Sequence, residues 1–136
     1  MEDWRLILMV GLPRAGKTTR ARQLAKELPA PIVNTDAIRE VLHGHRRLDD
    51  DEDRVWNIAR VMVHALFRAG HDCVILDATN TSARSRAMWE SGPWRVQYEV
   101  IGTSAAVCID RARCDGHAEL VPIIECMAAE YELVTR

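Results

Sequence analysis

The amino-acid sequence predicts an α/β fold, a three-layer αβα sandwich around a parallel sheet of about four strands. Short continuous apolar runs are typical of strands buried on both faces, and helical periodicity appears between these runs. A glycine-rich turn follows the first run, as expected of a strand–loop–helix unit. With 136 residues, of which 48% are apolar, the chain has enough material for one core, so we expect residues 1–136 to form a single domain.

The first part of the chain alternates strand and helix patterns. The apolar run 5–10 predicts a central strand, and apolar residues at helical spacing over 21–28 predict a helix after it. The segment 31–34 predicts a second, brief strand. Thr35 or Asp36 is expected to cap the short helix that follows this strand.

The acidic run 49–53 precedes a helical stripe over 55–66. In isolation the run resembles a binding tail, but negative charge at a helix N-terminus complements the helix dipole, which favours the structural interpretation. Gly70 is expected to end this helix. The buried run 73–77 then predicts a third strand, whose last residue is the carboxylate Asp77.

The remaining elements follow from capping residues and alternation. Asn80, Thr81 or Ser82 is expected to cap the next helix, whose basic face includes Arg84 and Arg86.

Alternation over 94–101 predicts a half-exposed strand near the sheet edge. Ser104 is expected to cap the next helix, and the polar stretch 111–119 is expected to form a lid. Pro122 then opens a last amphipathic helix.

Residues 11–18 match the pattern G-x-x-x-x-G-K-[ST], between a predicted strand and a predicted helix. Glycines at both ends let backbone N–H groups curl toward an anion, and the helix start adds the positive end of its dipole. The Lys17 ammonium is expected to neutralise charge on the β- and γ-phosphates, and the Thr18 hydroxyl is expected to be a ligand of magnesium. We therefore expect ATP or another nucleoside triphosphate, with Mg²⁺, to be bound by Gly11, Leu12, Pro13, Arg14, Ala15, Gly16, Lys17, Thr18 and Thr19.

Two carboxylates follow predicted strands, and the strand ends of a parallel sheet converge on one crevice. Asp36 there is suited to accept a proton from an attacking alcohol, although it also suits a helix cap. Arg39 lies one helical turn later and suits a phosphate, the alternative being a solvated surface arginine. Asp77 is expected to reach magnesium or to fix Thr18, which gives Thr18 and Asp77 as the metal residues.

Arg111 and Arg113 lie in the predicted lid, where one arginine can offset charge on the transferring phosphate. A solvated arginine is the alternative interpretation for each. The expected catalytic residues are thus Lys17, Asp36, Arg39, Arg111 and Arg113.

Composition excludes several classes of protein. A formal charge of −2 argues against bulk electrostatic coating of nucleic acid, so any such contact is local. The cysteines have no CxxC spacing and the histidines no metal-ligand spacing. No apolar run approaches the roughly 20 residues of a membrane span, and the chain starts with acidic residues, so we expect a soluble cytoplasmic protein.

Taken together, these motifs resemble the P-loop kinases of the polynucleotide 5′-hydroxyl kinase type, including phage and bacterial end-healing enzymes. The resemblance rests on residues 11–18, on the N-x-D-x-x-R-like segment 34–39, on 77–80, on Arg111 and Arg113, and on Val121-Pro122. It implies the P-loop NTPase fold, with Asp36 as the general base toward the acceptor hydroxyl and Arg39 as a ligand of acceptor phosphate.

The expected function is ATP-dependent transfer of the γ-phosphate to a hydroxyl, with the 5′-OH end of DNA or RNA as the favoured acceptor. Several arginines could form a local basic rim that binds an oligonucleotide, or they could simply keep the protein soluble: Arg39, Arg46, Arg47, Arg84 and Arg86. Two alternatives remain. One is a kinase of a nucleoside, sugar or antibiotic, because fold does not fix substrate, and the other is an ATP-binding or ATP-hydrolysing switch without an acceptor.

Overall fold

The structure is a computed structural model that describes residues 3–46, 48 and 51–135. Its strands are β1 (Arg5–Val10), β2 (Ile32–Asn34), β3 (Cys73–Asp77) and β4 (Arg95–Val100). Its helices are α1 (Lys17–Glu27), α2 (Thr35–His43), α3 (Glu52–Arg68), α4 (Ala83–Glu90), α5 (Ala105–Cys114), the short 3₁₀ helix η1 (Ala118–Leu120) and α6 (Val121–Ala129). Within the described ranges, no helix combines the length and the apolar character that crossing a membrane requires.

The four strands form one parallel sheet in the order β2-β3-β1-β4. β1 is central, as predicted, and Leu6 pairs with Val74 on one side and with Val96 on the other. Every residue of β3 is buried, whereas every residue of β4, at the edge, is exposed or only partly buried. The predicted edge position of the 94–101 segment is therefore confirmed.

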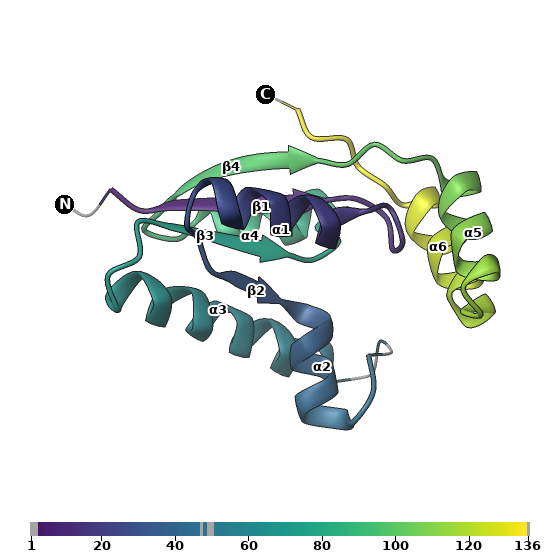
Figure 1. The fold of residues 1–136 in the computed structure, drawn as a ribbon, viewed down its shortest axis with the longest axis horizontal. Helices are drawn as coiled ribbons and strands as arrows, with labels where there is room; N and C mark the ends of the chain where they lie inside the picture. The colour runs from purple at the N-terminus through teal and green to yellow at the C-terminus, as the bar shows by residue number, and fades with distance from the viewer. Residues whose placement is uncertain (1–2, 47, 49–50, 136) are drawn as a thin grey trace.

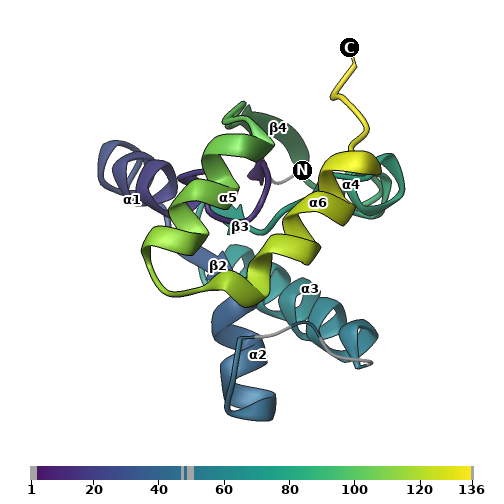
Figure 2. The same cartoon turned by 90° about the vertical axis from the view of Figure 1, so that its right-hand side faces the viewer.

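Helices cover both faces of this sheet, which confirms the three-layer sandwich (Figures 1 and 2). On one face, α1 packs Ala21 and Leu24 against Ile7 of β1. On the other face, α3 and α4 supply a larger core, whose buried side chains include Leu6, Leu8, Val55, Val63, Phe67, Val74, Leu76 and Trp89. The alternation of β1 residues between the two clusters follows from the strand period of two.

Helices α5 and α6 lie side by side across the carboxyl end of the sheet, facing the viewer in Figure 2. Cys108, Ala112 and Ile124 of this pair pack against Leu12 and Ala15, in the loop after β1. The segment 111–119, which was predicted to form a lid, is largely helical, since it includes the last turn of α5 and most of η1.

Three helix starts carry side-chain caps. The prediction for α2 is wrong, because the cap is Asn34, whose side chain accepts a hydrogen bond from the Ala37 N–H. The helix follows β2 without a loop, so the last strand residue occupies the capping position. Ser82 and Ser104 cap α4 and α5, as the sequence allowed.

The predicted exposure of Arg86 on the basic face of α4 is wrong. The side chain is buried, with Nη1 donating to the Asn80 carbonyl over 2.9 Å and Nη2 to the Leu133 carbonyl over 3.3 Å. The chain after α6 returns to the start of α4 and covers this position, as the 2.9 Å bond from Glu132 N–H to the Thr81 carbonyl also indicates. Arg47 of the predicted basic rim lies outside the described residues.

Candidate active site

The loop between β1 and α1 is tightly curled. Arg14 and Gly16 both have left-handed backbone conformations, with φ of 69° and 104°. Such turns direct successive N–H groups into one concave space, which suits an anion. At the start of the loop, a Cβ on Gly11 would lie 3.0 Å from the Ile101 carbonyl oxygen, so only glycine fits there without a shift.

The start of helix α1 differs from those of α2, α4 and α5. Its capping residue is Gly16, and no described side chain accepts a hydrogen bond from its first turn. No acidic residue lies in that turn either. The first N–H groups and the positive end of the helix dipole are thus left for an anion.

Lys17 is folded back onto this loop. Its Nζ donates to the Leu12 carbonyl over 2.6 Å, and the side chain is only 8% exposed. Burial lowers the pKa of the Lys17 ammonium below its ordinary value, and the charges of Asp77 and Asp36 partly oppose that shift. The partner of this cation is a neutral carbonyl, which a phosphate oxygen can replace.

Asp77 joins three elements at the end of the sheet. Its Oδ2 accepts from the Thr18 hydroxyl over 2.7 Å and from the Asn34 side-chain amide over 2.9 Å. The carboxylate is 4% exposed, so these hydrogen bonds offset the cost of burying it.

A magnesium site needs oxygen donors here. Within the described ranges, no cluster of three His, Cys, Asp or Glu side chains is able to hold a metal. Magnesium bound with a nucleotide, however, uses one or two protein oxygens and completes its octahedral shell with water and phosphate oxygens. The adjacent oxygens of Thr18 and Asp77 fit that donor set.

Asp36 and Arg39 lie on one face of α2, as their spacing predicts. Arg39 Nη1 donates to Asp36 Oδ1 over 2.8 Å. The same guanidinium donates to Glu52 twice, from Nε to Oε2 over 3.0 Å and from Nη2 to Oε1 over 2.6 Å. The side chain of Arg39 is 7% exposed, whereas that of Asp36 is 52% exposed. Although burial opposes its charge, the hydrogen bonds and charges of Glu52 and Asp36 raise the pKa of Arg39.

The two arginines of α5 are placed differently. Arg111 Nη1 donates to the backbone carbonyls of Arg14 and Ala15, over 3.2 and 3.3 Å, and so lies against the phosphate loop. Arg113 is exposed and does not line the pocket beside this loop. The side chain of Arg14 forms an ion pair with Asp115.

These groups surround one open pocket of about 720 Å³, a volume within the usual range for small-molecule sites. The predicted residues that line it are Pro13, Arg14, Gly16, Lys17, Thr18, Thr19, Asp36, Arg39, Asp77 and Arg111. Gly11, Leu12, Ala15 and Arg113 do not line it. Gly11 nevertheless anchors the loop, since its N–H donates to the Thr79 carbonyl over 3.0 Å.

Sequence reasoning did not assign several residues of this region to the site. Glu52 appeared only as part of an acidic helix start, and nothing local links it to Arg39, thirteen residues earlier. Asn34 has the same strand-end placement as Asp77, which is a usable signal. The apolar residues Leu120, Ile123 and Met127 form another wall of the pocket, although helical spacing alone does not distinguish them from core.

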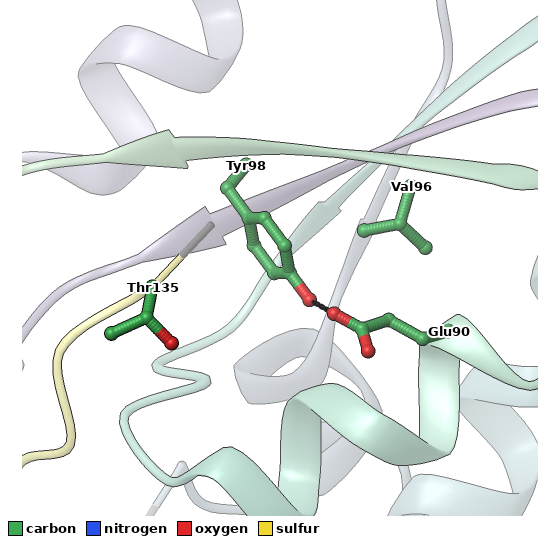
Figure 3. Close-up of a pocket in the computed structure, with 4 residues that line it drawn as sticks. All are labelled: Glu90, Val96, Tyr98 and Thr135. Atoms are coloured by element: carbon green, nitrogen blue, oxygen red, sulfur yellow. Dashed lines mark hydrogen bonds between the residues drawn. The ribbon is translucent and has the colours of Figure 1, made fainter.

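A second, smaller depression of about 250 Å³ is lined by Glu90, Val96, Tyr98 and Thr135 (Figure 3). The Tyr98 hydroxyl, from β4, donates to the Glu90 carboxylate at the end of α4. None of these four residues lines the larger pocket, and none of the predicted site residues lines this depression.

A family model described as an AAA domain matches residues 6–118. A solved structure of a Pnkp1/Rnl/Hen1 complex contains a chain with 27% sequence identity and a TM-score of 0.70, and the match covers 82% of this chain. The present chain spans only 40% of that chain's length.

Two other solved structures share the fold at lower identity. A sugar kinase from Janibacter sp. HTCC2649 has a TM-score of 0.74 at 21% identity, over 98% of this chain and 80% of its own. The Mycobacterium tuberculosis APS kinase CysC, in complex with AMPPNP and APS, has a TM-score of 0.70 at 17% identity, over 100% and 86%. Identities this low establish the architecture alone.

Proposed function

This chain belongs to the AAA domain family, as a P-loop kinase domain, and from that membership we propose that it transfers the γ-phosphate of ATP to a hydroxyl group. The observation that carries the proposal is the shared pocket, which is lined both by the half-exposed Asp36 and by loop residues that include Gly16, Lys17 and Thr18. A module that only binds or hydrolyses ATP has no need of the Asp36–Arg39 pair.

The loop and the start of α1 bind the phosphates of the donor. The N–H groups of the first turn of α1 donate hydrogen bonds to phosphate oxygens. The Lys17 ammonium gives up its hydrogen bond to the Leu12 carbonyl and binds the β- and γ-phosphates instead. Arg111 similarly gives up its hydrogen bonds to the loop carbonyls and binds the γ-phosphate as it is transferred. Magnesium, held by Thr18 and Asp77, would supply charge neutralisation on the phosphates.

Asp36 orients and deprotonates the acceptor. Its Oδ1 is held by Arg39, while Oδ2 accepts no hydrogen bond from the described residues and is available for a hydroxyl. The acceptor oxygen forms the new bond to the γ-phosphorus, its proton passes to Asp36, and the bond from that phosphorus to the β,γ-bridging oxygen breaks, which releases ADP.

One candidate acceptor is the 5′-OH end of DNA or RNA. The likeness to a chain of the Pnkp1/Rnl/Hen1 complex supports it, as does the arrangement of Asp36 and Arg39 on one helical turn. In this version of the proposal, Arg39 contacts the phosphate next to the terminal nucleoside.

The second candidate is a small alcohol. It is favoured by the hydrogen bonds of Arg39, whose N–H groups are already donated to two carboxylates rather than left for a phosphate. The pocket volume of about 720 Å³ also suits a donor nucleotide with a small acceptor.

The test is incubation with γ-labelled ATP and magnesium together with 5′-OH oligonucleotides of DNA and RNA, nucleosides, sugars and other small alcohols. We expect labelled acceptor with the unmodified protein and none with Asp36→Ala. Label found only as free phosphate, in equal amounts with both proteins, would contradict the proposal and favour a switch.

A further inference from the structure

Four basic side chains that line the pocket differ in their hydrogen-bond partners, and a fifth, Arg14, forms an ion pair with Asp115. Near the phosphate loop, Lys17 and Arg111 donate to backbone carbonyls, which carry no net charge. Near Asp36, Arg39 and Arg46 donate to carboxylates. Lys17 and Arg111 therefore have neutral hydrogen-bond partners that a phosphate can replace, whereas the partners of Arg39 and Arg46 are charged.

On the acceptor side, the guanidinium of Arg39 is hydrogen-bonded to the carboxylates of both Asp36 and Glu52. Glu52 takes the edge formed by Nε and Nη2, and Asp36 takes Nη1, which also lies 3.4 Å from the Thr35 hydroxyl. A phosphate binds arginine best through two parallel N–H bonds on one edge, and Glu52 already occupies such an edge in that manner. Displacing this carboxylate would break both of its charge-assisted hydrogen bonds to Arg39, which is costly because the two side chains are largely shielded from solvent.

The ion pairs of this region differ in their exposure to solvent. Arg46 pairs with Glu40, and Arg39 pairs with Asp36 and Glu52. Arg46 and Glu40 are exposed and contribute little, whereas Arg39 and Glu52 are more shielded from solvent. Of these ion pairs, Arg39–Glu52 is therefore the one that solvent screens least.

We propose that Glu52 is a specificity-determining residue, which keeps Arg39 from binding phosphate and so restricts the site to acceptors without a phosphate beside the reacting hydroxyl. This inference rests on the proposed phosphotransfer to a hydroxyl. It favours small alcohols, including free nucleosides, over polynucleotide ends, because a polynucleotide carries a phosphodiester next to its terminal 5′-hydroxyl.

The experiment compares thymidine with thymidine 3′-monophosphate as acceptors, with γ-labelled ATP and magnesium. The measured quantity is the ratio of kcat/KM for the phosphorylated acceptor to that for thymidine. Glu52→Gln should raise this ratio about tenfold, the effect of one charge-assisted hydrogen bond gained by phosphate. Asp53→Asn, which removes an exposed charge from the same helical turn, should leave the ratio unchanged. Glu52→Asp, which keeps the charge, should stay near the unmodified protein.

A binding measurement separates this inference from the proposed function. With a non-hydrolysable ATP analogue bound, calorimetric titration of thymidine 3′-monophosphate should show about tenfold tighter binding to Glu52→Gln than to the unmodified protein. That result supports the role of Glu52 even where no phosphate is transferred to either acceptor. Equal affinities in the two proteins would overturn it.

The unmodified protein alone also tests the inference, should Glu52→Gln fail to fold. We expect it to bind thymidine at least as well as thymidine 3′-monophosphate. A preference of about tenfold or more for the phosphorylated compound would show that Arg39 is open to phosphate and would overturn the proposal.

Discussion

The two halves of the pocket use the same kinds of side chain in opposite ways. In the donor half, Lys17 and Arg111 are held by carbonyl oxygens that carry no net charge. In the acceptor half, Arg39 is held by two carboxylates and is almost completely buried. A cation with a neutral partner exchanges that partner for a phosphate at little electrostatic cost, whereas a cation between carboxylates does not.

This difference assigns distinct roles to residues of similar chemistry. The donor half binds charge, since Lys17 and Arg111 can exchange their carbonyl partners for an anion. The acceptor half fixes geometry, since Arg39 holds one oxygen of Asp36, whose side chain lines the pocket. Variants that remove charge should therefore lower ATP affinity, the transfer rate or both in the first half, and the transfer rate alone in the second.

The largest effect is expected for Lys17→Ala. The loss of the ammonium should lower kcat/KM for ATP by about 10⁴-fold, because both phosphate binding and charge stabilisation during transfer are lost. Lys26→Ala, at the exposed end of the same helix, serves as the control and should change neither quantity. Calorimetry with ATP and magnesium measures the affinity; normal affinity in Lys17→Ala would refute the donor-half assignment.

Asp36→Ala should separate the two halves. We expect kcat for the preferred acceptor to fall about 10³-fold through loss of the general base, while the dissociation constant for ATP stays within about twofold of the original. Asp72→Ala, an exposed position just before β3, at the end of that strand away from Asp77, is the matched control. An unchanged rate of acceptor phosphorylation in Asp36→Ala would remove Asp36 from the mechanism.

The donor half was predictable from sequence because its signals are local. The strand run 5–10, the two glycines and Lys17-Thr18 are contiguous, and the strand-end rule then brings Asp77 to the same edge. The fold was predictable for the same reason, since the spacing of apolar residues within each strand or helix indicates that element by itself.

The acceptor half was only partly predictable because its decisive contacts join distant elements. Asp36 and Arg39 share a helical turn and were found by spacing, but the Glu52 contact depends on how α2 and α3 pack. Arg86 illustrates the same point, since its burial depends on the chain returning after α6 to contact it. Helical periodicity describes one element at a time and carries no information on such pairs.

Arg111→Ala tests the choice between the two arginines of the predicted lid. Arg111 lies against the loop carbonyls, so its removal should lower kcat about 10²-fold by loss of charge stabilisation on the transferring phosphate. Arg113→Ala, exposed and outside the pocket lining, should keep kcat near its original value. Single-turnover measurements with labelled ATP check both variants, and an equal loss in the two would reject the assignment of Arg111.

The smallest effect concerns pH and the charge of Lys17. Burial lowers the pKa of this ammonium from its ordinary 10.5, so its proton dissociates at lower pH than that of an exposed lysine. Only the protonated form attracts phosphate, and the phosphates of ATP are already ionised in this range. The dissociation constant for ATP should therefore begin to rise with pH below 10.5 in the unmodified protein.

Lys17→Arg supplies the control for this titration, because a guanidinium keeps its proton throughout the alkaline range. Its dissociation constant for ATP, although weaker at neutral pH, should stay level while that of the unmodified protein rises. Parallel curves for the two proteins would mean that the alkaline loss arises elsewhere in the chain. Divergent curves would tie it to the buried cation of the donor half, whose neutral carbonyl partner, unlike the carboxylates around Arg39, does little to hold its proton.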